Sequence, residues 1–183
     1  MKIKLKKVLI LVVSSLLLGA CSSLPKNLEA NSHDVITNYS AWKEADTDIG
    51  KQVRLGGVIA KVTNLKDSTR IEIVDLPINS AGQPDIHSEA KGRFIVYVKG
   101  FLDPVTFAKG RLMTALGTTQ KPEISKVGAY EYHFPVMQAT GYHLWRIQKR
   151  VVVDGPLYTY PCLGLYCHQY YGPREGRVVT EVQ

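Results

Sequence analysis

The 183-residue chain contains only three cysteines and five histidines, and no apolar run after residue 18 approaches the length of a membrane span. A spanning helix needs about 20 predominantly apolar residues. Several enzyme motifs are also missing, because the sequence has no Gly-x-Ser-x-Gly elbow, no His-Glu-x-x-His and no glycine-rich phosphate or dinucleotide loop. These absences argue against the common hydrolases, zinc proteases and nucleotide-binding enzymes.

The N-terminus has the organisation of a signal peptide. Four lysines between residues 2 and 7 precede an apolar stretch of 11 residues, 8–18, which is followed by the small residues Gly19 and Ala20. This stretch is too short for a bilayer span, but it matches the apolar region of a signal peptide. A buried core helix or strand is the alternative, and it would be expected to show an alternating or amphipathic pattern. Residues 1–20 are therefore predicted to be a signal peptide.

The signal peptide ends on a single cysteine, in the order Leu18-Gly19-Ala20-Cys21. This motif resembles the bacterial lipobox, and the resemblance implies that the chain is cut before Cys21 and that Cys21 is acylated. Two or more acyl chains anchor a protein stably in a membrane. Ser22 follows, where an aspartate would resemble the inner-membrane retention signal, so the resemblance implies the outer membrane. Cleavage by the ordinary signal peptidase is the alternative.

Removal of the signal peptide changes the charge balance of the chain. Residues 1–20 carry four lysines and no acidic residue, so the mature chain keeps 19 basic residues against 16 acidic ones. A net charge of about +3 gives little reason to expect nucleic acid as a partner. The remaining length suits one domain with a proper core.

The mature chain divides into three parts by pattern. Residues 21–33 are polar and lack periodicity, which predicts a tether between the lipid and the domain. Residues 34–149 are predicted to form the domain, and Val35, Ile36, Tyr39 and Trp42 recur at near-helical spacing at its start, which indicates a short helix. Residues 150–183 form a tail rich in tyrosine and proline.

From residue 51 the apolar pattern has a period of two, which is typical of half-buried strands. Gly56 and Gly57 predict a bulge or bend in the first strand, and Pro135 predicts a bulged or edge strand. Asp103 and Pro104 predict a helical turn between the third and fourth strands. Strands are expected over residues 53–62, 71–76, 93–98, 112–118 and 132–139, or 132–145 if the last one continues.

Five short strands and one short helix predict a mainly β fold, a small OB-like and partly open barrel. Glycines in the first and fourth strands permit the tight curl that such a barrel needs. An open sandwich of similar strands is the alternative.

Several separate motifs in this region resemble the Slp family, the starvation-inducible outer-membrane lipoproteins of Gram-negative bacteria. They are Val53-Arg54-Leu55-Gly56-Gly57-Val58-Ile59, Thr69-Arg70-Ile71-Glu72-Ile73, Leu76-Pro77, Gly92-Arg93-Phe94, Leu102-Asp103-Pro104, residues 130–135 and His143-Leu144-Trp145. The resemblance extends to about Arg146. It implies an acylated outer-membrane protein with its domain in the periplasm, and it supplies no catalytic residues.

The two remaining cysteines, Cys162 and Cys167, are predicted to form a disulfide, because Cys21 is used for lipid attachment and the periplasm is oxidising. A structural metal at these cysteines and His168 is the alternative, with His133 or His143 as a fourth ligand. A zinc deaminase site is a weaker match. It would combine a motif of the form His-x-Glu, residues 87–89, with the two cysteines, but their spacing of five positions does not fit the required Cys-x-x-Cys.

Aromatic residues are the last set with functional potential, and they are predicted mainly to form core, with a glycan or peptide groove as the alternative. They are Tyr97, Phe101, Tyr130, Tyr132, Phe134, Tyr142 and Trp145. The tail holds five further tyrosines, which suits a contact arm. The alternative is a loosely packed terminus in which residues 151–153 and 178–179 add edge strands.

These patterns favour a non-enzymatic structural or stress-related binding module of the cell envelope that uses no cofactor and no metal. Its partners would be membrane lipid through acylated Cys21, and an envelope protein or glycan through the tail or an aromatic groove. The alternative is a periplasmic small-ligand or glycan carrier, or a hydrolase with an unrecognised site. A polar pocket with converging ionisable groups would favour the alternative, whereas a filled barrel with an exposed apolar face would favour the binding module.

Overall fold

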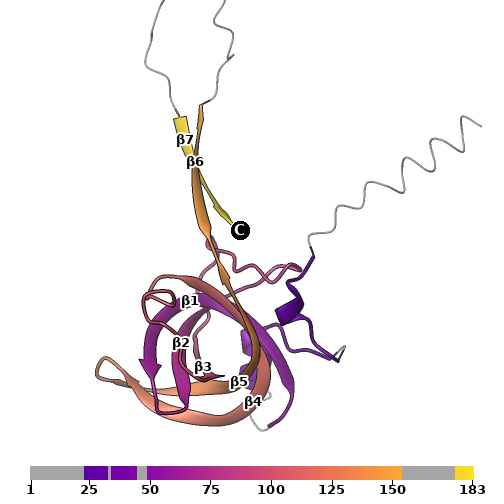
Figure 1. Ribbon diagram of the computed structural model, residues 1–183, viewed down its shortest axis with the longest axis vertical. Coiled ribbons are helices and arrows are strands. Elements are labelled where there is room, and N and C mark those ends of the chain that lie inside the picture. The colour runs from indigo at the N-terminus through magenta and orange to yellow at the C-terminus, as the bar shows by residue number, and fades with distance from the viewer. Residues whose placement is uncertain (1–22, 33, 45–48, 154–175) are drawn as a thin grey trace, which may run out of the picture.

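The structure, a computed structural model, describes residues 23–32, 34–44, 49–153 and 176–183 (Figure 1). The predicted lipid attachment at Cys21 and the predicted disulfide between Cys162 and Cys167 lie outside the described residues. The elements are the 3-10 helix η1 (Lys26–Leu28), the helix α2 (Tyr39–Glu44) and the strands β1 (Gln52–Asn64), β2 (Ser68–Leu76), β3 (Arg93–Lys99), β4 (Leu112–Val127), β5 (Tyr130–Trp145), β6 (Ile147–Val153) and β7 (Gly176–Val182).

Strands β1 to β5 form a closed barrel in the order β1-β2-β3-β5-β4 (Figure 1). Neighbouring strands are antiparallel except β3 and β5, whose parallel pairing closes the barrel over three positions, from Ile95 with Val136 to Tyr97 with Gln138. The prediction of a mainly β, five-stranded barrel with one short helix is confirmed. All five predicted strands are present. Strand β4 extends beyond its predicted end, and β5 continues to Trp145, as the longer of its two predicted extents has it.

Gly57 lets β1 approach β2 more closely than any other residue could. A Cβ atom at this position would lie 1.9 Å from the carbonyl oxygen of Val74, which is backbone and cannot move aside. The register between β1 and β2 shifts slightly further along, between Ile59 and Lys61. Pro135 likewise coincides with an irregularity, because the β4–β5 register shifts between Gln120 and Glu123. A proline has no N–H for the ladder, so a bulge accommodates it.

The barrel interior is filled with apolar side chains, and helix α2 and the β3–β4 turn add to this core. Trp42 of α2 packs edge-on against Phe94 of β3, with ring centroids 5.9 Å apart. The core consists of Tyr39, Trp42, Val53, Leu55, Ile59, Ile71, Ile73, Phe94, Val96, Val98, Leu102, Phe107, Met113, Ala115 and Met137. Burial of each large side chain contributes about 1.5–3 kcal/mol, so this set supplies most of the driving force for folding.

The N-terminal segment before α2 packs on the barrel, which differs from the predicted free tether over residues 21–33. Leu28 of η1 is 0% exposed, and its carbonyl oxygen accepts a hydrogen bond from the Arg54 guanidinium at 3.0 Å. The side-chain amide of Asn27 donates to the carbonyl oxygen of Tyr142. The sequence pattern missed this contact because a single buried leucine in a polar segment has no periodicity.

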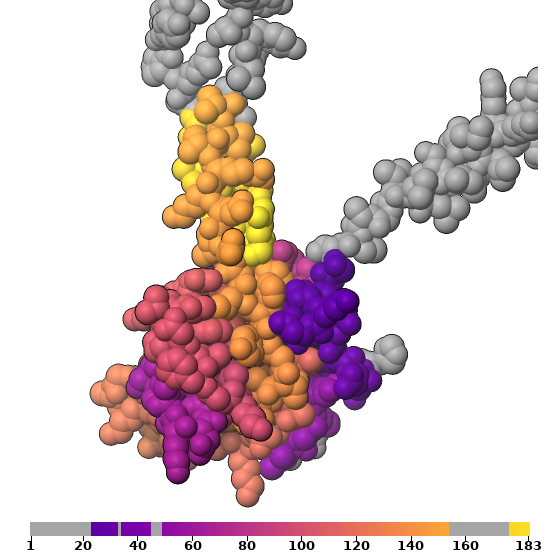
Figure 2. Space-filling model, in the orientation of Figure 1, coloured from indigo at the N-terminus to yellow at the C-terminus, as the bar shows by residue number. Residues whose placement is uncertain are grey.

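The C-terminal part is more regular than the predicted tail at both of its described ends. Strands β6 and β7 pair with each other in a separate two-stranded sheet, from Ile147 opposite Val182 to Val153 opposite Gly176. We refer to β6 and β7 together as the ribbon. It stands away from the barrel as a narrow column (Figures 1 and 2). The two valine runs therefore do form strands, but on each other and not on a barrel edge.

Candidate functional site

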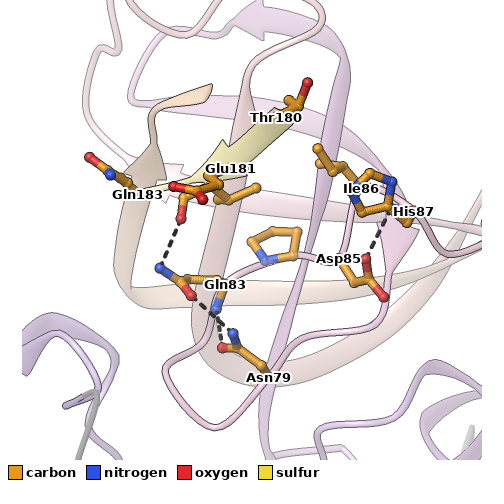
Figure 3. A pocket seen from close by; sticks show the side chains of 10 residues that line it. Asn79, Gln83, Asp85, Ile86, His87, Thr180, Glu181 and Gln183 are labelled. Carbon is orange, nitrogen blue, oxygen red and sulfur yellow. Dashed lines mark hydrogen bonds between the residues drawn. The ribbon is translucent and has the colours of Figure 1, made fainter. Parts of the chain in front are cut away.

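A groove with a volume of about 570 Å³ lies between the β2–β3 loop and the end of β7 (Figure 3). Most of its lining side chains are polar, and the segments that supply them are about 100 residues apart in the sequence. The lining consists of Asn79, Gln83, Pro84, Asp85, Ile86, His87, Thr180, Glu181, Val182 and Gln183. The groove therefore exists only because the ribbon base folds back against the loop.

The loop side of the groove is held in shape by its own short-range hydrogen bonds. The side-chain oxygen of Asn79 accepts from the backbone N–H groups of Ala81 and Gln83, both at 3.0 Å. Such an Asx turn is a typical use of asparagine. Gly82 adopts φ +80°, and its carbonyl oxygen accepts a 2.6 Å hydrogen bond from the buried hydroxyl of Thr114. The loop is thus fixed to the barrel wall.

One side-chain contact joins the loop to the ribbon base, and a second one within the loop supports it. The side-chain amide of Gln83 donates to the carbonyl oxygen of Val182 at 3.1 Å, and Asn79 donates to the Gln83 side-chain oxygen at 2.9 Å (Figure 3). The backbones of Arg146 and Gln183 exchange a pair of hydrogen bonds, which closes the ribbon at the barrel. These contacts give the groove two stable walls.

Asp85 and His87 line the groove, and Ser88 follows in the same turn; these are the three residue types of a hydrolase triad, but in a different arrangement. The Ser88 hydroxyl donates directly to the Asp85 carboxylate at 2.7 Å, and the backbone N–H of His87 donates to the same carboxylate at 2.9 Å. These two hydrogen bonds, that from Ser88 above all, lower the pKa of Asp85. In a triad the serine would instead be paired with the imidazole. The geometry is that of a turn and not of a catalytic triad.

A second, smaller pocket of about 230 Å³ lies where α2 meets the end of β2, and it surrounds Asp75. Only 2% of Asp75 is exposed, and its Oδ1 atom has no hydrogen-bond partner among the described residues. Burial raises the pKa of this carboxyl to about 6, although the nearby Lys91 lowers it. Tyr39 completes the pocket, and burial followed by the hydrogen bond with Tyr132 raises its pKa. Three ionisable groups thus converge at this pocket.

A third polar cluster lies on the outer wall of the barrel. Arg70 forms an ion pair with Glu123 at 2.8 Å, and the Tyr97 hydroxyl donates to the same carboxylate at 2.7 Å. Burial disfavours the charge on Glu123, but hydrogen bonds from Arg70 and Tyr97 lower its pKa. The guanidinium also lies 5.9 Å from the ring centroid of Phe134. Every charge in this cluster has a partner, so it braces β2, β3 and β4 together.

The structure separates the aromatic residues that the sequence grouped. Phe134 and Trp145 are buried, as predicted for core, whereas Phe101 and Tyr130 are each 72% exposed. The other three, Tyr97, Tyr132 and Tyr142, are half-buried, and the seven do not line one groove. The groove of Figure 3 has no aromatic lining apart from the imidazole of His87, so an aromatic pattern could not have located it.

The histidines predicted as alternative metal ligands lie apart. His133 is exposed, and His143 packs against Trp145 with ring centroids 4.4 Å apart. Within the described ranges, no three His, Cys, Asp or Glu side chains are grouped as metal ligands would be, while Cys162, Cys167 and His168 lie outside them. Among the same residues, no helix has the length and apolarity to cross a membrane.

Comparison with known proteins places the chain in a family. The profile of the outer membrane lipoprotein Slp family matches residues 18–175, which include Cys21. The chain belongs to the Slp family. The chain is 33% identical to the outer membrane protein Slp of Escherichia coli K12 over 148 residues, covering 80% of this chain and 78% of the relative.

Two further relatives have less informative names. The uncharacterized lipoprotein YeaY of Escherichia coli K12 is 33% identical over 143 residues, covering 76% of this chain and 72% of the relative. An uncharacterized protein of Haemophilus influenzae is 34% identical over 131 residues, covering 71% of each chain. The family resemblance that the motifs indicated is thereby confirmed, and the match extends beyond Arg146 into the tail, to residue 175.

Proposed function

We propose that this Slp-family protein is a non-catalytic binding module, anchored in the outer membrane by acylated Cys21 with its barrel in the periplasm. The outer membrane and the lipid follow the family description, and the lipobox pattern names the residue. The periplasmic side is the expected one for a chain exported by a signal peptide and fixed by its N-terminus.

The observation that carries the proposal is the filled barrel. Apolar side chains with at most 7% exposure occupy the interior, so binding has to take place on the outside of the wall. The groove at the ribbon base offers a concave surface with fixed walls, in which polar side chains lie beside the apolar side chains of Pro84, Ile86 and Val182. Its exposed amide, carboxylate and hydroxyl groups suit a glycan or a polar peptide segment of an envelope protein.

Substitution at Thr180, which lines the groove, tests this function. A Thr180→Trp variant should fill the groove and reduce partner binding about tenfold or more, because shape complementarity is lost. The matched control Thr180→Val keeps the volume and should bind normally. Binding is measured by crosslinking in intact envelopes for protein partners, and by co-sedimentation with purified cell-wall sacculi for glycan. Equal binding by both variants in both assays would exclude the groove.

A small-ligand carrier is the second candidate, and the pocket around Asp75 is the observation that favours it. An unpartnered carboxylate oxygen within a small polar pocket suits a ligand with a hydrogen-bond donor. Native mass spectrometry of the protein released gently from envelopes tests this function. A bound small molecule present in the wild type and absent from Asp75→Asn would support the carrier, whereas identical masses apart from the substitution would exclude this pocket.

A further inference from the structure

One face of the ribbon carries exposed apolar side chains. Side chains alternate between the two faces of a strand, so Ile147, Val151 and Val153 of β6 share a face with their partners on β7, Val182 and Val178. Val151 is 68% exposed and Val178 is 63% exposed. We call these five residues the apolar face of the ribbon.

The opposite face of the ribbon differs in chemistry. It carries Gln148, Arg177 and an ion pair between Arg150 and Glu181, which lies opposite Gln148 in the register, together with the half-buried Val152 and Val179. The ribbon is therefore amphipathic, and an isolated two-stranded ribbon of this kind is marginally stable in water. Strands β6 and β7 pair with each other and not with a barrel strand. Val182 packs against an apolar cluster at the ribbon base, whereas Val151, Val153 and Val178 are exposed, so the barrel leaves most of the apolar face uncovered. A surface outside the described residues would stabilise it.

The N-terminal segment brings the lipid anchor to the base of the ribbon. Leu24, at the start of the described chain, packs in the same apolar cluster as Val182 of β7 and Ile86 of the loop. Cys21 precedes Leu24 by three residues, which can span about 10 Å at most. If Cys21 is acylated as proposed above, the bilayer surface lies within about this distance of the ribbon base.

Charge also favours a phospholipid surface. Strands β6 and β7 carry Lys149, Arg150 and Arg177 against the single acid Glu181, which is paired with Arg150. Arg150 and Arg177 lie on the face opposite the apolar face. Basic residues close to a bilayer attract anionic headgroups, with about 1 kcal/mol for each residue. Lys149 lies on the apolar face, and a lysine there can extend its charged end to the headgroups while its stem remains among apolar groups.

We propose that the apolar face of the ribbon lies on the phospholipid surface of the bilayer that holds Cys21. The inference rests on the proposed acylation of Cys21. It makes the ribbon a second membrane contact, which fixes the orientation of the barrel relative to the bilayer and holds the groove close to the membrane surface.

Photo-crosslinking of the full-length, membrane-anchored protein tests the proposal. A photo-reactive amino acid replaces Val151 on the apolar face or, as the matched control, Gln148 on the polar face of the same strand. Irradiation in intact envelopes should give phospholipid adducts mainly at Val151, at about fivefold the yield at Gln148. Equal lipid yields at both positions would overturn the proposal, as would adducts of Val151 with a second copy of the chain or with another protein.

A charge substitution provides the second arm. Val178→Glu should lower the phospholipid adducts at Val151 about fivefold, because it places an acid against anionic headgroups. The chain should remain in the membrane fraction, since acyl chains hold it. The control Val105→Glu removes an 82% exposed valine that is not on the ribbon and should change nothing. Unchanged adducts with Val178→Glu would overturn the proposal. The mass of the peptide containing Cys21 reports acylation separately, so failure of the anchor and failure of the ribbon contact are distinguishable.

Discussion

The carboxyl group of Asp75 lies at the end of β2 with 2% of the residue exposed, and burial raises its pKa to about 6. An acid with a raised pKa in the folded state binds its proton more tightly there than in the unfolded chain. The contribution of Asp75 to the free energy of unfolding is therefore most favourable at low pH. It is lost as the pH rises from the unfolded pKa, near 4, through about 6. A change in pH between about 4 and 6 therefore changes the stability of the fold through protonation of Asp75.

The Asp75→Asn variant should remove this pH dependence and leave the pocket shape unchanged. A shift of about two pKa units corresponds to about 2–3 kcal/mol, so at pH 7 the variant should be more stable than the wild type by up to about 2 kcal/mol. At pH 4 the two should be equal. Urea unfolding at pH 4, 5.5 and 7 measures the difference. A variant less stable than wild type at pH 7 would mean that the charged carboxylate makes a favourable contact.

Any side chain at Gly57 would lower the free energy of unfolding. In Gly57→Ala the new methyl group would overlap the Val74 carbonyl oxygen, so β1 and β2 would have to separate. We expect a loss of about 3 kcal/mol or more in the free energy of unfolding. The control is Gly176→Ala on the ribbon, where the nearest atom belongs to the flexible Val151 side chain and the change should stay within about 0.5 kcal/mol. Thermal unfolding compares them, and similar melting temperatures would contradict the close-approach argument.

At the scale of the elements, η1 and the ribbon have the same relation to the barrel. Each is a short element that would have little stability alone, since η1 has three residues and the ribbon has two strands. Both are attached at the cluster around Leu28 and Trp145, which includes Leu24 and Val182. One small apolar cluster thus positions the start and the end of the described chain, and with them the groove.

The segment between β6 and β7 contains Cys162 and Cys167, and their pairing stays a prediction. Closing so short a loop contributes about 2 kcal/mol at most, and the ribbon forms a sheet separate from the barrel. Mass mapping of the protein isolated without reductant should find the two cysteines linked, and reduction should leave the melting temperature of the barrel within about 2 °C. Two free thiols in the oxidised protein would disprove the pairing.

At the scale of the whole molecule, we expect the N-terminus to determine which membrane holds the barrel. Cys21→Ser should leave the chain unprocessed or remove it from the outer-membrane fraction, because no other attachment follows from the sequence. Ser22→Asp should keep the lipid but redirect the protein to the inner membrane, since an aspartate there resembles the retention signal. Membrane fractionation measures both variants. A Cys21→Ser chain that was processed and still found in outer membranes would contradict the anchor.

The sequence by itself determined the strands, the turns and the family. The alternation of apolar residues along β1 to β3 is a local property of each strand, and the bulge at Pro135 follows from a missing N–H, so both could be predicted. The cap at Asp103 is equally local, because its carboxylate accepts from the backbone N–H groups of Val105 and Thr106.

Only the tertiary structure decided which residues meet across the chain. In the sequence, Asp75 is one polar residue of an alternating strand. In the structure it is buried because α2 packs over the end of β2. Leu28 has no periodic neighbours, yet it is buried in the cluster with Leu112 of β4 and Trp145 of β5. The groove joins the β2–β3 loop to β7 through Gln83 and Val182, 99 positions apart, and no local pattern encodes such a contact. Burial and long-range contact depend on the packing of whole elements, which periodicity in one segment does not contain.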